Sequence, residues 1–231
     1  MEHLFYDKRV DCPCCKNSFK TKKVRRRGLK VLERHTDFCV AYKDINPIYY
    51  HVWICPNCGF SASESEYRDL TKDQRLFFQG NISRKWNQRD YGGIRTFEEA
   101  EESYKLALMV AQLFKKPKGY IGGICLKLGW LYREQKNDKE FEFLKHALHS
   151  FEAAYQKEPL PIAGLDEISL AYLVGELHRR FDHIQDAIKW YAKALDHPDI
   201  KKKRQIQLLA REQWRLAREQ YRLEKEDSVH A

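Results

Sequence analysis

Residues 51–60 read "HVWICPNCGF", and this stretch decides how the front of the chain folds. An apolar, strand-like run leads into two cysteines two residues apart, with Pro56 between them and Gly59 after them. The same Cys-Pro-x-Cys frame occurs earlier, in "DCPCCK" at residues 11–16. Each frame holds two thiolates at a nearly constant separation, so the pair together predicts one metal site.

The predicted ligands are Cys12, Cys15, Cys55 and Cys58. Between the frames lie 39 residues, more than the roughly 15–20 of the common four-cysteine finger. A zinc ribbon tolerates this gap, because its knuckles are joined by a β-hairpin of variable length. Four thiolates leave Zn²⁺ no open position for water, so we expect a structural rather than a catalytic ion. The first frame carries Lys16 where the second has a glycine.

The remaining thiols and nearby histidines leave alternatives open. Cys14 keeps a thiol–disulfide centre possible, although no βαβ unit of the thioredoxin type is near it. Cys39 can be a fifth ligand, a partner of Cys14, or a small buried apolar residue, and the last is favoured because free cysteine is usually buried. His35 and His51 can each replace a thiolate, but strand histidines are more often packed or solvated. Cys125 lies in an apolar helical pattern and is expected in the core.

Charge and composition limit the possible classes of protein. The net charge is +9, of which residues 1–60 carry +6 and the remaining 171 residues +3, which suggests a domain boundary and allows an acidic partner. No apolar run approaches the roughly 20 residues of a membrane helix, and residues 1–10 lack the layout of a signal peptide. Seven cysteines, an odd number, argue against a disulfide framework. We therefore expect a cytoplasmic protein that does not enter membranes.

The pattern of elements predicts an α+β fold that is mostly α. Residues 1–65 suggest strands and knuckles, including a strand over "IYYHVWI" at residues 48–54. Thereafter the period is helical, interrupted by a loop at residues 80–93. Thr96 is the expected N-cap of one long helix. The predicted helices cover residues 65–79, 96–116, 121–135, 138–157, 165–180, 184–195 and 199–225.

One helix pair points to a repeat architecture. In "ISLAYLVGELHRRFDHIQDAIKWYAKALDHPD", residues 168–199, the small Gly175 and Ala187 stand where two antiparallel helices must touch. Tyr191 and Ala194 follow at helical spacing, which resembles a tetratricopeptide (TPR) repeat. We count two full repeats and a half, with the last helix as a cap. The predicted organisation is a zinc-ribbon-like module at 1–65, a connecting helix and loop at 66–95, and a TPR-like helical domain at 96–231.

An array of this kind forms a concave groove lined by the first helix of each pair. An aromatic and arginine lining suits a peptide or an acidic tail, so a protein or peptide partner is expected. Packing and solvation explain the same residues equally well. By position the lining residues are Trp130, Arg133, Tyr172, Glu176 and Arg179.

Nucleic acid is the alternative partner. The most basic stretch is "KTKKVRRRGLK", residues 20–30, and phosphate binding needs little more than such a cluster on a rigid platform. Tyr49 and Trp53 on the predicted neighbouring strand can stack bases. A charge run also protects an exposed edge strand from aggregation. The basic residues concerned are Lys22, Lys23, Arg25, Arg26 and Arg27.

No catalytic motif is evident. The chain lacks GxSxG, P-loop and HExxH patterns, and Glu142, His146 and His149 on one helix face are more typical of a solvated stripe than of a second metal site. We therefore expect a non-enzymatic zinc-binding interaction or scaffold protein. The alternative is a nucleic-acid-binding regulator that uses the basic hairpin.

The motifs "CPCCKNSFKTKKVR" (12–25) and "HTDFCVAYKDINPIYYHVWICPNCGFSA" (35–62), with the helices that follow, resemble a bacterial family catalogued as domain of unknown function 2225. The resemblance covers nearly the whole chain. It implies a zinc-ribbon start followed by TPR-like helices, a cytoplasmic protein, and a role near the metal for Cys39, which belongs to the family's shared pattern. It implies no activity. Lys16 and the additional Cys14 depart from the standard knuckle.

Overall fold

The structure is a computed structural model that describes residues 2–230 and the side chains of residues 2–226. The fold is α+β and mostly α, as predicted. The chain forms two compact units. The first comprises Met1–Glu33, Val40–Lys116 and Lys127–Glu140, and the second comprises Arg34–Cys39, Pro117–Leu126 and Phe141–Ala231. No helix within residues 2–230 is long and apolar enough to cross a bilayer.

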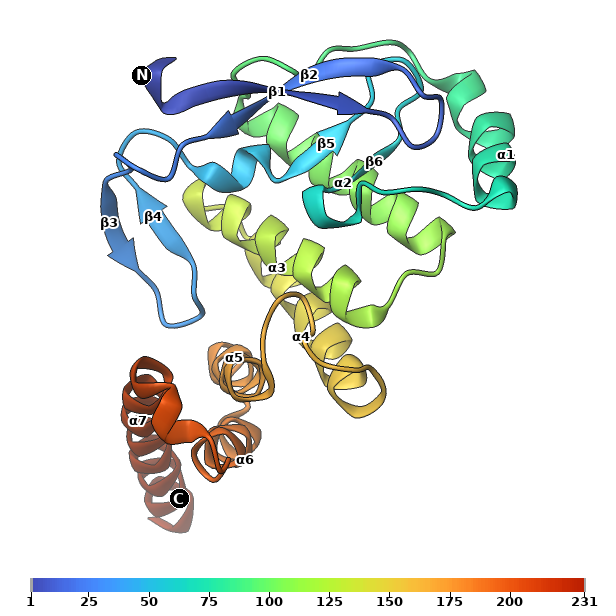
Figure 1. The fold of residues 1–231 in the computed structure, drawn as a ribbon. Coiled ribbons are helices and arrows are strands. Elements are labelled where there is room, and N and C mark those ends of the chain that lie inside the picture. Colours follow the sequence, from blue (N-terminus) through green and yellow to red (C-terminus); the bar gives the residue numbers. More distant parts are fainter. Residues whose placement is uncertain (1, 231) are drawn as a thin grey trace. The chain divides into compact units, whose positions relative to one another are not determined.

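The strands form three two-stranded sheets. In the first unit, β1 pairs antiparallel with β2, and β5 pairs antiparallel with β6 (Figure 1). Each of these two hairpins turns at one of the Cys-Pro-x-Cys frames. The third hairpin, β3–β4, lies between them in the sequence. The strands are β1 (Phe5–Asp11), β2 (Ser18–Val24), β3 (Val31–Arg34), β4 (Val40–Tyr42), β5 (Val52–Ile54) and β6 (Ser61–Ser63).

The predicted strand over residues 48–54 is wrong in its first half. Pro47–Tyr50 forms a 3₁₀ turn, and only Val52–Ile54 is extended. Pro47 cannot donate a backbone hydrogen bond and suits the first position of a helical turn. The Asn46 side chain accepts a hydrogen bond from the Ile48 N–H at 3.2 Å and caps that turn. Local capping therefore outweighs the β propensity of the aromatic residues that follow.

Two complete helices within the described residues 2–230 belong to the first unit. α1 (Lys72–Asn81) is capped by Thr71, and a short 3₁₀ turn at Glu64–Glu66 precedes it, where one continuous helix over 65–79 was predicted. α2 (Phe97–Leu113) packs on β5 and β6 (Figure 1). The first unit therefore extends well beyond residue 65.

The helix cap and a buried arginine fasten the start of α2. The predicted N-cap Thr96 is confirmed, with a capping box completed by Glu99. Next to it Arg95, only 5% exposed, donates to the backbone carbonyls of Tyr91, Tyr49 and Val52 at 2.8–3.1 Å. Burial lowers the pKa of this guanidinium. These contacts join the turn before β5 to the turn before α2.

The second unit is a helical array in which each helix packs on the next. An added Cβ on Gly122 of α3 would lie 3.0 Å from Phe151 of α4, and one on Gly175 of α5 would lie 2.8 Å from Tyr191 of α6. Small residues thus stand where helices touch, as predicted for Gly175. The helices are α3 (Lys118–Glu134), whose first half belongs here, α4 (Lys139–Lys157), α5 (Glu167–Arg180), α6 (Ile184–Leu195) and α7 (Arg204–His230).

Candidate metal centre

The first cysteine frame forms a tight turn between β1 and β2. The Cys12 N–H donates to the Asn17 carbonyl at 2.9 Å, and the Lys16 N–H donates back to the Cys12 carbonyl at 2.9 Å. Lys16 adopts φ 62°, a left-handed conformation that favours glycine. The turn presents Cys12 and Cys15 on one side.

The second frame repeats this geometry between β5 and β6. The Cys55 N–H donates to the Phe60 carbonyl and the Gly59 N–H donates to the Cys55 carbonyl, both at 2.9 Å. Gly59 adopts φ 76°, and a Cβ added to it would lie 2.5 Å from the Trp86 ring. At position 59 both the positive φ and the lack of room for a Cβ favour glycine. At position 16 only the positive φ favours it.

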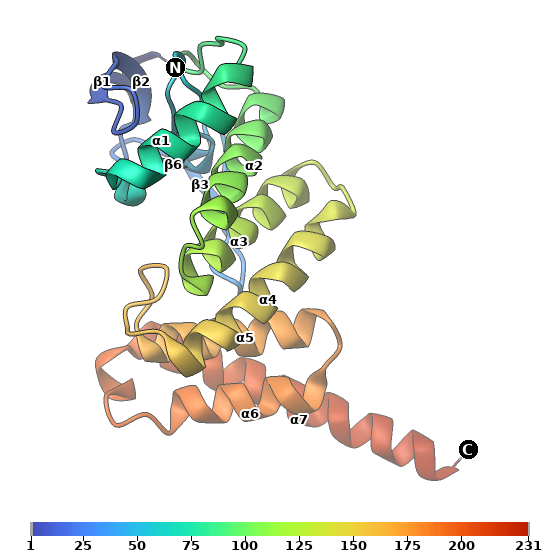
Figure 2. The ribbon, with the colours of Figure 1, turned by 90° about the vertical axis from the view of Figure 1, so that its right-hand side faces the viewer.

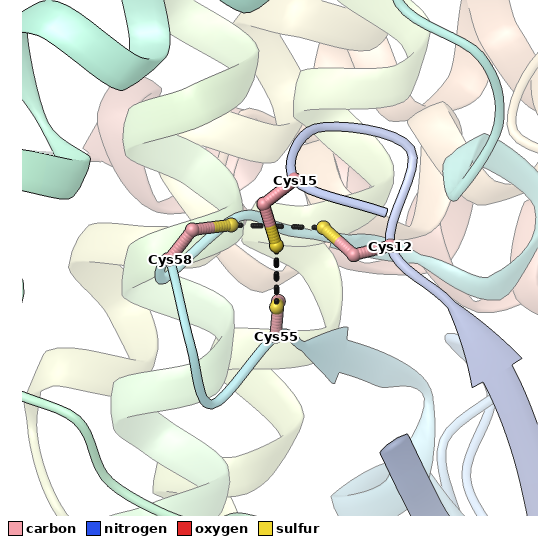
Figure 3. A group of neighbouring side chains, drawn as sticks. All are labelled: Cys12, Cys15, Cys55 and Cys58. Atoms are coloured by element: carbon pink, nitrogen blue, oxygen red, sulfur yellow. Dashed lines mark hydrogen bonds between the residues drawn. The ribbon is translucent and has the colours of Figure 1, made fainter. Parts of the chain in front are cut away.

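The two turns bring four sulfurs together (Figure 3). The Sγ atoms of Cys12 and Cys58 are 3.6 Å apart, those of Cys15 and Cys55 are 3.5 Å apart, and all four lie within 4.8 Å of one another. Four sulfurs about 2.3 Å from one ion, arranged as a tetrahedron, are separated by about 3.8 Å. The donor set and its spacing therefore fit one tetrahedrally coordinated ion. No disulfide joins any of the seven cysteines.

Most of the site is buried. Cys12 and Cys55 are fully buried and Cys58 is 3% exposed, while Cys15 is half-buried. Aromatic rings cover the cluster: Phe60 packs edge-on against Phe78 with centroids 5.5 Å apart, and both are buried. An ion bound by all four sulfurs would have no open coordination position.

Side chains of α1 and of the loop that follows it form hydrogen bonds to both cysteine turns. Their hydrogen bonds to knuckle carbonyls come from Gln79 to Cys14 at 3.2 Å, from Ser83 to Cys58 at 3.1 Å, and from the Trp86 indole to Pro56 at 2.8 Å. Our sequence interpretation missed these supporting residues, because it treated residues 80–93 as a plain loop. The available signal was the single tryptophan in that polar stretch, since a large aromatic ring rarely stays in solvent without a partner.

The thiols of the metal-free cluster cannot all ionise together. Contacts with Cys55 and Cys58 lower the pKa of Cys12, and the same contacts with Cys12 raise the pKa of Cys55 to about 12 and also raise that of Cys58. The Cys12 thiolate is thus stabilised by hydrogen bonds from neighbouring thiols, which stay protonated. A divalent cation would reverse this preference, because it stabilises all four sulfurs as thiolates.

The other candidate ligands lie outside this group. Within residues 2–226, the group at ligand distance is the four cysteines, without Cys14, Cys39, His35 or His51. Cys39 is 7% exposed in the second unit, and its N–H donates to the Asp37 carboxylate at 3.3 Å. Its placement agrees with the small buried residue favoured from the sequence rather than with a fifth ligand.

Two residues of the predicted groove are covered by the chain itself. Tyr172 and Glu176 of α5 are fully buried. The tip of the β3–β4 hairpin, residues 34–39, packs on them: the Tyr172 hydroxyl donates to the Thr36 carbonyl at 2.9 Å, the Thr36 hydroxyl donates to Glu176, and the Phe38 and Tyr172 ring centroids are 5.3 Å apart. In this conformation neither residue is available to a partner.

The remaining predicted groove residues are also engaged within the chain. Arg179 donates to Glu176 at 2.6 Å, and the buried Tyr191 hydroxyl donates to the same carboxylate at 2.7 Å. In the first unit Arg133 pairs with Glu140 at 2.8 Å, and Trp130 is half-buried. The five predicted residues are divided between the two units.

The basic hairpin keeps only part of its predicted charge free. Lys22 pairs with Asp7 at 2.7 Å and Lys23 pairs with Glu64 at 2.7 Å. Arg25 lies over the Tyr6 ring, 5.0 Å from its centroid. Arg25, Arg26 and Arg27 are exposed in the turn after β2.

The predicted base-stacking pair is not offered to solvent. Trp53 is 5% exposed, and Lys8 covers its ring with the ammonium 4.7 Å from the centroid. Tyr49 is half-buried, and its pKa is raised first by burial and then by Glu134. The expectation that Trp53 stacks bases is therefore wrong for this conformation, because the ring belongs to the core of the first unit.

Comparisons with known proteins place the chain among bacterial proteins. A family model described as "Uncharacterized protein conserved in bacteria (DUF2225)" matches residues 5–217. A curated protein of Borreliella burgdorferi, named "Uncharacterized protein", is 23% identical over 172 residues, covering 65% of this chain and 61% of that protein. The chain thus spans about three fifths of that relative's length. No solved structure matches the chain.

Proposed function

The chain belongs to the bacterial family of uncharacterised proteins whose model spans residues 5–217, and from this premise we propose that it is a non-enzymatic interaction protein whose first unit is held together by a structural Zn²⁺. Membership confirms the resemblance drawn from the cysteine frames. The family's description names no activity, so the proposal is argued from the site.

One observation carries the proposal: four cysteine sulfurs, from two turns related by the same backbone hydrogen bonds, lie within 4.8 Å of one another in a buried cluster. A closed four-thiolate site contributes folding free energy and offers no vacancy for chemistry. Cys12, Cys15, Cys55 and Cys58 would hold the ion, which neutralises their charge and links β1–β2 to β5–β6. The second unit, an array of helices with TPR-like spacing, would supply the surface that binds a protein.

Metal analysis of the purified chain tests the site. We expect one zinc per chain, retained on gel filtration, and loss of that zinc in Cys55→Ser, because three thiolates bind far more weakly than four. Cys125→Ala removes a buried thiol outside the cluster and should keep the full zinc content. A purified chain that carries no metal contradicts the proposal. A chain that carries iron contradicts only the identity of the ion as zinc, since a tetrahedral sulfur site also accepts iron.

A second candidate is nucleic-acid binding, and the exposed Arg25, Arg26 and Arg27 favour it. Charge reversal at Arg26 and Arg27 should then weaken binding of an oligonucleotide and reduce its salt dependence. Reversal of Lys22, which already pairs with Asp7, should have a smaller effect. If the affinity for the oligonucleotide is the same in both charge-reversal variants as in the wild type, this candidate is contradicted.

A further inference from the structure

We propose that the groove between α6 and α7 binds an acidic segment of a partner protein. The inference rests on the interaction function proposed above and names the surface and the chemistry of the partner. The groove is open, with a volume of about 770 Å³. None of the residues predicted from the sequence as partner-binding lines it.

The floor of the groove is apolar. Ile188 of α6 and Trp214 and Tyr221 of α7 line it, and each is half-buried against the hydrophobic core of the second unit. Gln185 reaches the Tyr221 hydroxyl at 3.4 Å and ties the two helices together at this end. The floor residues therefore pack against the core on one side and present apolar surface to the groove, which a partner side chain can cover.

The rim of the groove is mainly basic. Arg218 lies over the Trp214 ring, 4.6 Å from its centroid, and forms no ion pair with any carboxylate among residues 2–226. Among the residues whose side chains the structure describes, the acidic one in the lining is Glu219. The basic residues of the lining are Lys189, Arg215, Arg218, Arg222 and Lys225.

Existing ion pairs offset part of this charge without cancelling it. They join Arg215 to Glu219 at 3.3 Å, Lys189 to Asp186 at 2.8 Å, and Arg222 to Glu226 at 3.7 Å. Arg218, which has no such pair among residues 2–226, keeps its charge over the apolar floor. All three pairs are well exposed, and exposed pairs contribute little, so carboxylates of a ligand can replace the internal partners.

Complementary charge together with an apolar floor selects the occupant. A second copy of this chain carries the same net charge of +9 and would be repelled. A nucleic acid would offer phosphates to the rim but no aliphatic side chain to cover Ile188 on the floor. An acidic segment with large apolar side chains at helical spacing satisfies both rim and floor. The C-terminal part of α7 runs on past the start of α6 (Figure 2).

Fluorescence anisotropy of the full-length, zinc-loaded chain tests the groove. The probe is a labelled short peptide of glutamate and aspartate with leucine at every third or fourth position, and its matched control has glutamine and asparagine instead. We expect the acidic peptide to bind and the neutral one to bind at least about tenfold more weakly. Added salt should weaken the acidic peptide only.

Variants locate the binding. Arg218→Glu should reduce affinity by about tenfold or more, and Arg218→Gln by less, since it removes the charge without reversing it. Lys201→Glu makes the same charge change at an exposed residue outside the lining and should alter affinity by less than about twofold. Circular dichroism and zinc content, measured on every variant, verify that each remains folded.

Several results would overturn the inference. It fails if the two peptides bind equally, if the folded wild type does not bind the acidic peptide, or if Arg218→Glu leaves its affinity unchanged. An oligonucleotide that displaces the acidic peptide, or a dimer that dissociates in Arg218→Glu, would assign the groove to another occupant. A zinc-loaded chain that ignores the peptide leaves the metal-stabilised interaction function standing with another surface. A chain without metal that still binds through Arg218 leaves the groove standing and contradicts the zinc proposal.

Discussion

Lys16 and Gly59 occupy the same position in two turns of the same geometry, but their surroundings differ. Both have positive φ, 62° and 76°, and both donate to the carbonyl of the cysteine four residues earlier. Only Gly59 faces a ring, that of Trp86. The substitution of one lysine for the expected glycine is thus tolerated because its side chain has room.

Alanine substitution at the two positions separates backbone strain from crowding. Gly59→Ala adds a left-handed residue and a Cβ that meets Trp86, so the free energy of unfolding should fall by about 1–3 kcal/mol. Lys16→Ala changes neither φ preference nor space and should shift it by less than about 0.5 kcal/mol. Urea denaturation of the zinc-loaded proteins measures both, and equal losses would contradict the distinction.

Glu176 is a buried carboxylate with three partners: Arg179, Tyr191 and Thr36. Glu176→Ala leaves those donors unsatisfied and should lower the free energy of unfolding by about 2–4 kcal/mol. Thr36→Ala removes one hydroxyl from the hairpin tip and should lower it by about 1 kcal/mol. A double-mutant cycle should give a positive coupling energy, whereas strict additivity would show that the tip does not dock on Glu176 in solution.

At the scale of elements, each of the two turns carries two of the four clustered cysteines, and an ion bound there would displace the protons of the thiols. Because the pKa of Cys55 is raised to about 12 in the metal-free cluster, and that of Cys58 is also raised, both thiols are protonated at neutral pH. Zinc binding should therefore release protons, and the affinity should fall as the pH falls, since protons then compete better for the sulfurs.

Calorimetry in two buffers with different ionisation heats measures that proton release. Cys125→Ala is the matched control and should release as many protons as the wild type, because Cys125 lies outside the cluster. Zinc binding without proton release would mean that the ligands are not thiols.

Local patterns explain which elements the sequence could predict. The helix at Ile184–Leu195 was predicted with both its ends, because its apolar spacing and its flanking residues agree. The cluster of four cysteines was predicted because each half of it is contained in four consecutive residues. The turn at Pro47–Tyr50 was missed because its cap is a single asparagine side chain, which outweighs a strand-like composition.

Long-range contacts explain what the sequence could not predict. Thr36 meets Tyr172, 136 residues later, and no periodicity in either segment indicates this pairing. Tyr172 and Glu176 have the spacing of groove residues whether they face a partner or the chain's own hairpin. Phe38 of the docked tip has φ 69°, a backbone conformation that costs about 1–3 kcal/mol for such a residue.

At the scale of the whole molecule, the two units are interleaved along the chain. The second unit takes residues 34–39 from the front of the sequence, so the fragment 96–231, the helical domain predicted from the sequence, lacks the tip. We expect this fragment to unfold at lower temperature than the corresponding transition of the full chain, because Tyr172 and Glu176 lose their cover. Thermal denaturation followed by circular dichroism measures the difference, and an identical midpoint would show that the tip adds no stability.

Because the tip lies early in the sequence, it is synthesised before the helix on which it docks. A ribosome delivers Phe38 long before it delivers α5, so the nascent hairpin emerges with its docking site still untranslated. Val31 and Leu32 on the same hairpin are 41% and 66% exposed even in the finished protein. During translation this early segment therefore exposes apolar side chains before their docking site exists, and slower synthesis between the tip and α5 would lengthen that exposure.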